Sequence, residues 1–464
     1  MLVRQAAWTF TLLTQIVAVV ALPAIRLSGL SFPVAWGTSM VNGGEWMVKQ
    51  VNDNPALLPN YSLEILWQDG GCDSLVGQRA LYANWFRKSY HLLNGSTVSG
   101  IKTVGLIGPD CSPTSLAQAA LAYNVRMPMI SASSTFPSLS DRSQNPGFWR
   151  TIVPDSRLVE AFVATVRSFG FNEVAVIADA EIAANFLPKL LEAVDKFGVE
   201  LLGPSMFFGP HANGWLLRPD SAEEGAREIS EELVALRPSP PRFVILMIDE
   251  PRLGRAVLCA AFHLGLSSHI TFMTFGWLGD IWWRDLPQGY HCTEQDMEVA
   301  VNQTISTQAV QKRSDLGTRL SCSASATAAD FFADLGDVLE EAASSADAVC
   351  TYAKMLHELI YTHGNTLAEL EDSSDDIYSQ AQQILEATDF EGTQGRMQFL
   401  PGLPDPHGAV EIQQIQISNF TQMQKTLLAR YAAGAFSWFG CGDVAPGRKV
   451  GSCQWSQLGE QYRL

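Results

Sequence analysis

The feature that most constrains the fold is a series of short, uninterrupted apolar segments, each followed by a segment with helical periodicity. Segments of this kind are "TVGLIG", "EVAVIAD", "RFVILMID" and "HITFMTF". Continuous apolar strands are typical of a sheet covered on both faces, and their alternation with helices is typical of a mostly parallel sheet. Because this alternation runs through both halves of the chain, we expect an α/β protein of two units, each with its own sheet flanked by helices.

Composition and charge narrow the class of partner. The chain has 464 residues, of which 47% are hydrophobic and 17% charged, as in globular proteins. Its net charge is −17. Nucleic acids and anionic membrane surfaces both require basic patches on their partners, so we expect neither of these.

The N-terminus predicts export. Residues 1–24 have the pattern of a secretory signal peptide, with Arg4, an apolar run from about 6 to 22, and small residues at Ala21 and Ala24. An uncleaved signal anchor is the alternative, because the run approaches membrane-spanning length. Four N-x-S/T sequons fit an exported glycoprotein, at Asn60, Asn94, Asn302 and Asn419.

An even number of cysteines in an exported chain favours disulfides. The eight cysteines fall into neighbourhoods, although spacing alone proves no pair. Cys72 and Cys111 lie in loops after strands of the first half, Cys259 and Cys292 flank one helix–strand unit, Cys441 and Cys453 lie close together in the tail, and Cys322 and Cys350 remain. A zinc site is not indicated, because the chain has no C-x-x-C and its histidines do not cluster at ligand spacing.

The junction "GPDCSPTS" joins a strand to a helix and carries more than a connector needs. Ser112 stands directly before Pro113, so we expect Ser112 to cap a helix that starts at Pro113. Its hydroxyl would then lie where free N–H groups and the helix dipole favour an anion. Three further loops follow the carboxyl ends of strands, where open α/β sheets bind ligands, namely "SASSTFPSLSDR", "DEPR" and "GWLGDIWW".

Other segments are predicted more coarsely. The amphipathic stretch 75–93 and residues 329–363 and 374–387 are expected to be helical. The small and polar residues 311–328 predict a surface loop. "GRMQFL" and "AVEIQQIQIS", separated by "PGLPDPHG", predict a terminal hairpin.

The order and spacing of several motifs resemble a known family. "GPDCSPTS", "MPMISASSTFPSLSDR", "FWRTIVPDS" and "NEVAVIAD" resemble the receptor ligand-binding region, the type I periplasmic-binding-protein fold of class C G-protein-coupled receptors and natriuretic peptide receptors. "AVLCAAFHLGL", "FMTFGWLGDIWW", "CTEQDMEVAV" and "FEGTQGRMQFLPG" look most like the metabotropic GABA type B receptor branch. The resemblance covers roughly residues 29–425.

The resemblance implies a bilobed clamshell that closes on its ligand. Lobe 1 would hold residues 29–151 and 281–385, lobe 2 residues 152–280 and 386–430, and residues 431–464 would form a Cys-containing tail. It also implies the disulfides Cys72–Cys111 and Cys259–Cys292. No cofactor is implied.

The site residues that the resemblance implies come from both lobes. Ser112 and Thr135 match residues that hold a ligand carboxylate, with Ser133 and Ser134 as neighbouring candidates. Glu341 matches a glutamate that pairs with the ligand's ammonium group, and Asp249 and Glu250 are further acidic candidates. Trp277 matches a tryptophan that covers the ligand from lobe 2, and Trp36 is a weaker match in lobe 1.

Each of these residues also has an ordinary structural role to weigh. Ser112 suits a helix cap, the Ser-rich loop suits local turns, Trp277 suits core packing beside Trp282 and Trp283, and Glu341 suits a solvated helix face. Two positions depart from the GABA-binding branch: Ile152 replaces a histidine and Ile248 replaces an aromatic residue. GABA itself is therefore not assumed.

Three functions follow from these observations, and a fourth is not expected. The first is an extracellular domain that senses a small amino-acid-like ligand and couples to G proteins if joined to a seven-helix region, which this chain does not show. Alternatives are a secreted solute-binding protein for amino acids and a non-binding partner subunit of a receptor dimer. The resemblance also suggests a homo- or heterodimer through lobe 1. An enzyme is not expected, because the chain has no G-x-S-x-G, Walker A or G-x-G-x-x-G motif.

Overall fold

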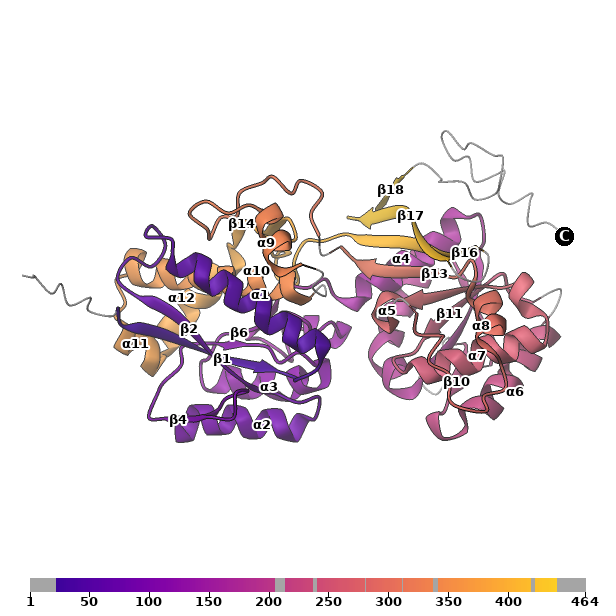
Figure 1. Cartoon of the computed structure of the whole chain (residues 1–464), viewed down its shortest axis with the longest axis horizontal. Coiled ribbons are helices and arrows are strands. Elements are labelled where there is room, and N and C mark those ends of the chain that lie inside the picture. The colour runs from indigo at the N-terminus through magenta and orange to yellow at the C-terminus, as the bar shows by residue number, and fades with distance from the viewer. Residues whose placement is uncertain are drawn as a thin grey trace, which may run out of the picture.

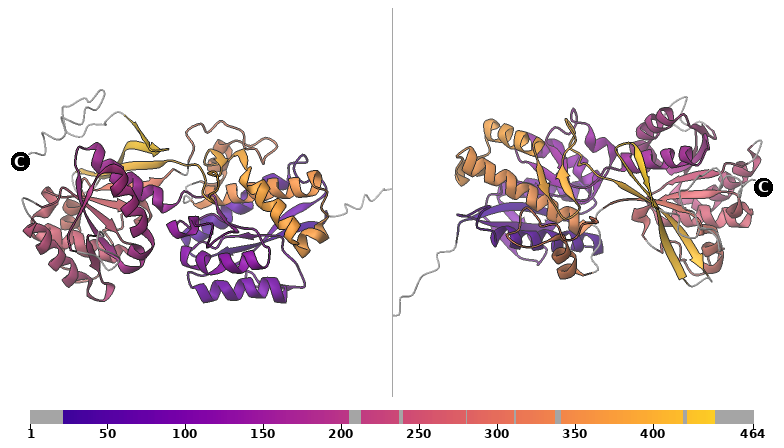
Figure 2. Two further views of the ribbon diagram at one scale, coloured as in Figure 1. Left: turned by 180° about the vertical axis from the view of Figure 1, so that it is seen from behind. Right: turned by 90° about the horizontal axis from the view of Figure 1, so that it is seen from above.

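The computed structural model describes residues 22–204, 213–236, 240–279, 281–310, 312–336, 341–418 and 422–439. Within them the chain forms two α/β units that lie side by side (Figure 1). The units remain distinct when seen from behind and from above (Figure 2). Residues 1–21 of the predicted signal peptide, the sequon Asn419, and the tail with Cys441 and Cys453 lie outside the described residues.

The sheet of the first unit is five-stranded and parallel, in the order β2-β1-β5-β6-β7. Its strands are β1 (Ala24–Ser31), β2 (Ser62–Asp69), β5 (Leu106–Ile107), β6 (Met129–Ser131) and β7 (Phe148–Arg150). Helices and small hairpins complete the unit: α1 (Ala35–Asn52), α2 (Ser74–Tyr82), α3 (Ser112–Asn124), α9 (Ala328–Leu335), α10 (Glu341–His357), α11 (Leu367–Asp372), α12 (Asp375–Glu386), β3 (Ser89–His91), β4 (Thr97–Ser99), β14 (Asp389–Glu391) and β15 (Arg396–Gln398).

The second unit has a nine-stranded mixed sheet in the order β10-β8-β11-β12-β13-β16-β17-β18, with β9 also paired to β8. Its strands are β8 (Glu173–Asp179), β9 (Glu200–Leu202), β10 (Trp215–Leu217), β11 (Phe243–Met247), β12 (Thr271–Phe275), β13 (Ile305–Ala309), β16 (Val410–Ser418), β17 (Gln422–Ala432) and β18 (Ala435–Trp438). Its helices are α4 (Asp155–Ser168), α5 (Ala180–Phe197), α6 (Ala222–Ala235), α7 (Pro251–His263) and α8 (Glu294–Val301).

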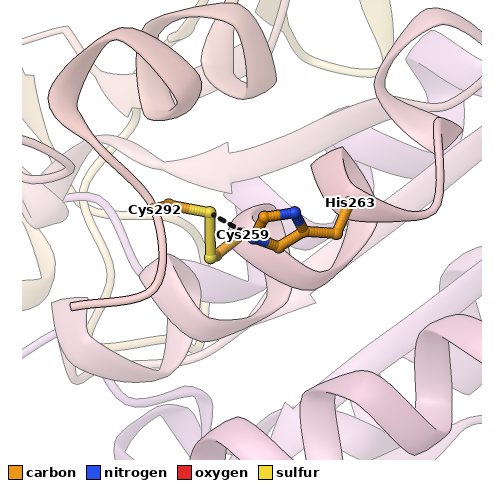
Figure 3. A group of neighbouring side chains, drawn as sticks. All are labelled: Cys259, His263 and Cys292. Carbon is orange, nitrogen blue, oxygen red and sulfur yellow. Dashed lines mark hydrogen bonds between the residues drawn. A yellow bond between two sulfur atoms is a disulfide. The ribbon is translucent and has the colours of Figure 1, made fainter.

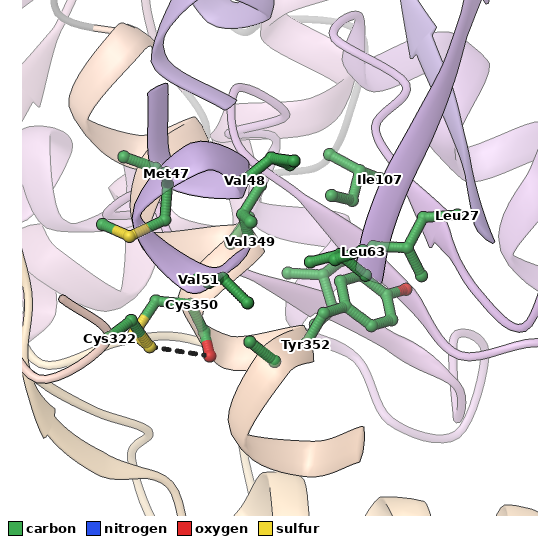
Figure 4. Close-up of a cluster of buried hydrophobic side chains, with 14 of the residues drawn as sticks. Leu27, Met47, Val48, Val51, Leu63, Ile107, Cys322, Val349, Cys350 and Tyr352 are labelled. Carbon is green, nitrogen blue, oxygen red and sulfur yellow. Dashed lines mark hydrogen bonds between the residues drawn. A yellow bond between two sulfur atoms is a disulfide. The ribbon is translucent and has the colours of Figure 1, made fainter. Parts of the chain in front are cut away.

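Both sheets are buried on both faces, which confirms the predicted α/β architecture. In the first unit, α1 and α10 cover one face with a large cluster that includes Leu27, Val51 and Val349 (Figure 4), and α2 and α3 cover the other. In the second unit, α4 and α5 pack on one face and α6, α7 and α8 on the other. Burial from both sides explains why the strands are uninterrupted apolar runs.

The chain passes between the units three times in the described region, and two of these crossings lie later than expected. The first follows β7, as predicted. The second follows β13, because β13 pairs with β12 and extends the second sheet, so residues 281–309 do not belong to lobe 1. The third follows β15, because Phe390 and Met397 pack in the core of the first unit and not in lobe 2.

Three local predictions need correction. The predicted hairpin is wrong: β15 pairs with β14 and β16 pairs with β13 and β17, so the two segments lie in different units. The helix predicted over 75–93 stops at Arg87, where Lys88 takes a left-handed conformation and β3 follows. The loop 311–328 is not wholly at the surface, since Leu320 and Cys322 are buried in the first core.

Three disulfides join described cysteines. Cys72–Cys111 and Cys259–Cys292 are the pairs that the resemblance implied, and both are confirmed. The third, Cys322–Cys350, ties the long loop before α9 to α10. Each bridge lies within one unit, so the disulfides brace the two units separately.

Three of the four sequons lie among the described residues. Asn60, Asn94 and Asn302 are exposed. In the described part of the chain, no helix combines the length and apolar character needed to cross a bilayer.

Candidate ligand-binding site

Ser112 does not cap its own helix, contrary to the prediction. Helix α3 includes Ser112, and Cys111 occupies the N-cap position without a side-chain cap bond. The Ser112 hydroxyl oxygen accepts hydrogen bonds from the backbone N–H groups of Thr135 (2.9 Å) and Phe136 (3.2 Å). The loop after β6 places these two N–H groups next to Ser112. The Ser112 oxygen therefore accepts hydrogen bonds from them and not from the N–H groups of its own helix. The hydroxyl hydrogen makes no bond within the described residues.

Thr135 connects this loop to the second unit. Its carbonyl accepts the N–H of Asp155 (3.0 Å), the first residue of α4. Burial raises the pKa of Asp155 to about 7, against the lowering effects of a hydrogen bond from Thr135 and the charge of Arg150. The nearby charge of Asp249 raises the pKa further. Thr135 thus bonds directly to an acid, Asp155, that sequence reasoning missed, although "FWRTIVPDS" contains it.

Ser134 lies behind this surface. It is fully buried, and its hydroxyl lies 2.7 Å from that of Ser115 and within bonding distance of the carbonyls of Pro109 (3.0 Å) and Asp110 (3.1 Å). Ser133 is partly exposed, and its N–H donates to Ser131. Ser134 therefore joins the two loops that carry Ser112 and Thr135.

Arg150 holds the Ser-rich loop in place. Its fully buried guanidinium donates to the carbonyls of Ser134 (3.1 Å) and Phe136 (3.0 Å). It also pairs with Asp405 (2.7 Å) at the third crossing, whose side chain is only 5% exposed. A buried arginine with carboxylate and carbonyl acceptors gives a rigid mount. In the sequence, the role of Arg150 was indicated only by its place in the segment "FWRT".

Asp110, two residues before Ser112, is a second buried acid, and the charge of Glu341 acts on it. One Asp110 carboxylate oxygen accepts from the N–H of Phe32 (2.7 Å) and the hydroxyl of Ser31 (3.0 Å). Burial raises the pKa of Asp110 to about 7, and the charges of Glu341 and Asp69 add to this. Glu341 begins α10, and its own burial raises its pKa. Its environment differs from the solvated helix face that was the alternative.

Trp277 stands in the second unit at the end of β12. Its ring stacks on Phe275, with centroids 3.9 Å apart, and meets Phe186 edge-on at 6.1 Å. Phe186 in turn contacts Phe136 of the first unit at 6.0 Å. Trp277 is 38% exposed, whereas Trp282 and Trp283 are buried. The ring is thus supported on one side and open on the other.

The remaining candidates take less central places. Asp249 is exposed, and its backbone N–H donates to Asp179. Glu250 precedes α7 and pairs with Arg252. Trp36 is partly exposed beside Phe32.

The two departures from the GABA-binding branch are both buried. Ile152 is 6% exposed at the first crossing. Ile248 is fully buried and belongs to the core of the second unit. At these two positions the structure places apolar side chains inside the protein.

One cluster has the composition of a metal site but not its chemistry. Cys259, His263 and Cys292 lie together, with His263 Nε2 3.4 Å from the sulfur of Cys292 (Figure 3). The two sulfurs are bonded to each other, so neither is a thiolate that could bind a metal.

A cavity lies beside the predicted ligand-binding residues, and none of those residues lines it. It holds about 630 Å³, within the range of small-molecule pockets. Both units and the third crossing line it, through Ser138, Arg157, Asn185, Leu403 and Asp405 among others. A hydrogen bond from Ser138 to Asn185 (3.3 Å) joins the two units at its edge.

Comparison with known proteins agrees with this architecture. Residues 47–418 match the receptor family ligand binding region. The gamma-aminobutyric acid type B receptor subunit 1 of Mus musculus is 24% identical over 391 residues, which cover 80% of this chain and 37% of that protein. The taste receptor type 1 member 1 of Homo sapiens is 31% identical over 136 residues, covering 29% of this chain and 16% of that protein.

A third relative is the speract receptor of Strongylocentrotus purpuratus, 28% identical over 132 residues that cover 28% of this chain and 10% of that protein. The chain spans little more than a third of the length of the first of these relatives. These matches are to receptors and not to catalytic domains, and they confirm the resemblance inferred from the motifs. With its match over residues 47–418, the chain belongs to the family of receptor ligand-binding regions.

Proposed function

We propose that this chain is an extracellular domain that senses a small amino-acid-like ligand by closing its two lobes around it. The observation that carries the proposal is the pair of hydroxyls at Ser112 and Thr135, mounted on loops that Arg150 and Ser134 hold rigidly. When the binding groups are held rigidly, the ligand can stabilise one arrangement of the lobes over the other.

The roles within the site follow from chemistry. The Ser112 and Thr135 hydroxyls, with the N–H groups at the start of α3, would hold a ligand carboxylate without a full positive charge. Glu341 would hold the ammonium group, with Asp249 as a further acidic candidate. Trp277 would cover the ligand from lobe 2 when the lobes close, because its ring is exposed on one side. Ser134 would act from behind as support.

Signalling through G proteins would require that the chain be joined to a seven-helix region. Two relatives that align over 80% of this chain are named gamma-aminobutyric acid type B receptor subunit 1, which supports this proposal. A secreted solute-binding protein would use the same site without that region. The receptor domain and the secreted solute-binding protein would both bind ligand, so the thermal unfolding test described below applies to both.

We also propose that the first unit carries a dimer interface on α2 and the short helix after it, Ala83–Arg87. Leu75, Tyr82 and Phe86 are 62%, 50% and 55% exposed, which is unusual for large apolar side chains. Replacing Tyr82 and Phe86 by glutamate should convert a dimer to a monomer in analytical ultracentrifugation. A dimer that survives this change would contradict the proposed interface.

The test of ligand sensing is thermal unfolding of the secreted protein with a panel of amino acids, ω-amino acids and amines. A ligand that binds only the folded state stabilises it by about 2.7 kcal/mol at a hundredfold excess over Kd. The shift should disappear in the Ser112→Ala, Thr135→Ala double variant. A cooperative transition that no compound shifts would favour the non-binding partner subunit instead.

A further inference from the structure

The disulfide Cys259–Cys292 differs from the other two disulfides because a histidine lies against it. His263 Nε2 is 3.4 Å from the Cys292 sulfur, and this nitrogen and the two sulfurs all lie within 4.8 Å of one another (Figure 3). Among the residues that the structure describes, no other group of His, Cys, Asp or Glu side chains forms such a cluster. The other two disulfides therefore have no comparable neighbour.

The local fold accounts for this convergence. Cys259 and His263 stand four residues apart on α7, so their side chains lie on the same face of the helix. Cys292 comes from the end of the connection that leads into α8, which packs against α7 in the same core. Two ligands one helical turn apart, with a third from a neighbouring segment, are a common arrangement in zinc sites.

The histidine is available to a metal. His263 is exposed, and its ring makes no hydrogen bond within the described residues other than the one to Cys292. In a tetrahedral zinc site with Zn–S of about 2.3 Å and Zn–N of about 2.0 Å, neighbouring ligand atoms are about 3.4–3.8 Å apart. The distance of 3.4 Å from His263 Nε2 to the Cys292 sulfur already has this value. Only the bond between the two sulfurs prevents the three groups from serving as ligands.

We infer that Cys259, His263 and Cys292 form a latent zinc site, which binds Zn²⁺ once a thiol reductant has cleaved the disulfide. This inference is independent of the proposed ligand-binding site. The two thiolates and the neutral His263 Nε2 supply three ligands, and a water completes the tetrahedron.

The cleavage is an ordinary thiol–disulfide exchange. The reductant thiolate attacks the Cys259 sulfur and the Cys292 thiolate leaves, because a protonated His263 beside it stabilises the leaving thiolate. A second reductant thiolate then attacks the reductant sulfur of the mixed disulfide and releases the Cys259 thiolate. The protein disulfide gains two electrons, the two reductant thiols are oxidised to one disulfide, and their two protons pass to solvent when Zn²⁺ binds.

The position of the site gives it a structural consequence. The connection from β12 to α8 carries Trp277 near its start and Cys292 near its end. The disulfide anchors this connection to α7. Zinc bound by the same residues would keep the anchor after reduction, so the segment that carries Trp277 would stay attached in both redox states.

The test uses the full chain, reduced with dithiothreitol and freed of it by gel filtration under argon. Co²⁺ serves as the probe, because tetrahedral Co²⁺ with thiolate ligands absorbs visible light, and Zn²⁺ should displace it. The reduced protein should show this absorption and the oxidised protein should not. His263→Ala should weaken binding of Co²⁺ and Zn²⁺ at least tenfold. His269→Ala is the matched control, since it removes another exposed histidine of the second unit, and it should leave the affinity unchanged.

Thermal unfolding shows whether the metal binds a folded protein. If reduction alone abolishes the cooperative transition, Zn²⁺ should restore it in the natural chain and not in His263→Ala. Equal metal affinities of the reduced natural protein and His263→Ala would overturn the inference, because the metal would then be held by other groups. Absence of metal binding by the reduced protein would also overturn it. Neither result bears on the proposed function, whose test uses the oxidised protein.

Discussion

The two walls of the candidate site differ in how firmly the fold holds them. In the first unit, Ser112 is 8% exposed, Ser134 is fully buried, and both take part in bonds that end at the buried Arg150. In the second unit, Trp277 is 38% exposed and Asp249 is exposed. The groups of the first wall are buried and fixed by hydrogen bonds, whereas those of the second wall are exposed to solvent. Under the proposed function, ligand would first bind the fixed wall and the open wall would then close on it.

The largest expected effect comes from breaking the mount of the fixed wall. Arg150→Met would leave the buried Asp405 carboxylate and two loop carbonyls without their donor. Removing one partner of a buried ion pair costs about 3–5 kcal/mol, so the free energy of unfolding should fall by this amount in urea titration. The control is Arg227→Met, whose pair with Glu231 is half exposed and whose loss should be near zero. Equal losses of stability in the two variants would show that the buried Arg150–Asp405 pair does not hold the loops of the site in place.

The next effect is a pH dependence of the free energy of unfolding. It arises from Asp155, the first residue of α4. Its pKa is about 7 in the folded protein, against about 3.9 for an unperturbed aspartate. The folded state therefore holds the extra proton between these pH values. The stability that this gives is full below about pH 4 and is lost as pH rises through about 7, by about 4 kcal/mol.

Asp155→Asn should remove this dependence, so the variant should gain stability relative to the natural protein as pH rises from about 5 to about 8. Unfolding free energies at several pH values measure the difference. The exposed Asp220→Asn serves as the matched control and should follow the natural protein. Parallel curves for Asp155→Asn and the natural protein would show that Asp155 is not the titrating group.

A smaller effect is expected at the first hydroxyl. Ser112→Ala leaves the N–H groups of Thr135 and Phe136 without their acceptor, which should cost about 1–3 kcal/mol of stability. Ligand affinity should fall at least tenfold, because the carboxylate also loses a donor. Ser112→Thr keeps a hydroxyl and should restore part of both quantities. Full affinity in the alanine variant would remove Ser112 from the site.

The smallest change in stability is expected on the open wall. Trp277→Ala should change the free energy of unfolding by less than about 1 kcal/mol, because the ring is partly exposed, but it should reduce the ligand-induced thermal shift. The buried Trp283→Ala provides the contrast and should cost about 3–5 kcal/mol. A large loss of stability at Trp277 would mean that this wall is as fixed as the other.

The sequence predicted the parts of the fold that depend on local pattern. Buried strands such as β8 and β11 are uninterrupted apolar runs, and the helices that cover them carry one apolar face, so both could be located. The motif order identified the family, and the resemblance implied two disulfides that the structure contains. Strand partners were harder: β13 and β15 were assigned to the wrong units because pairing depends on the whole sheet.

For the site, the sequence by itself determined which hydroxyl and acidic residues stand at the ends of strands, because strand ends and loop residues are local features. Only the tertiary structure decided their bonding partners. Ser112 looked like a cap, yet its oxygen is taken by N–H groups that follow a different strand. Asp155 and Arg150 gained their places through burial and through contacts with residues on other elements, up to 255 positions away in the chain. Hydrogen bonds and desolvation act through space, so residues distant in sequence set the chemistry of this site.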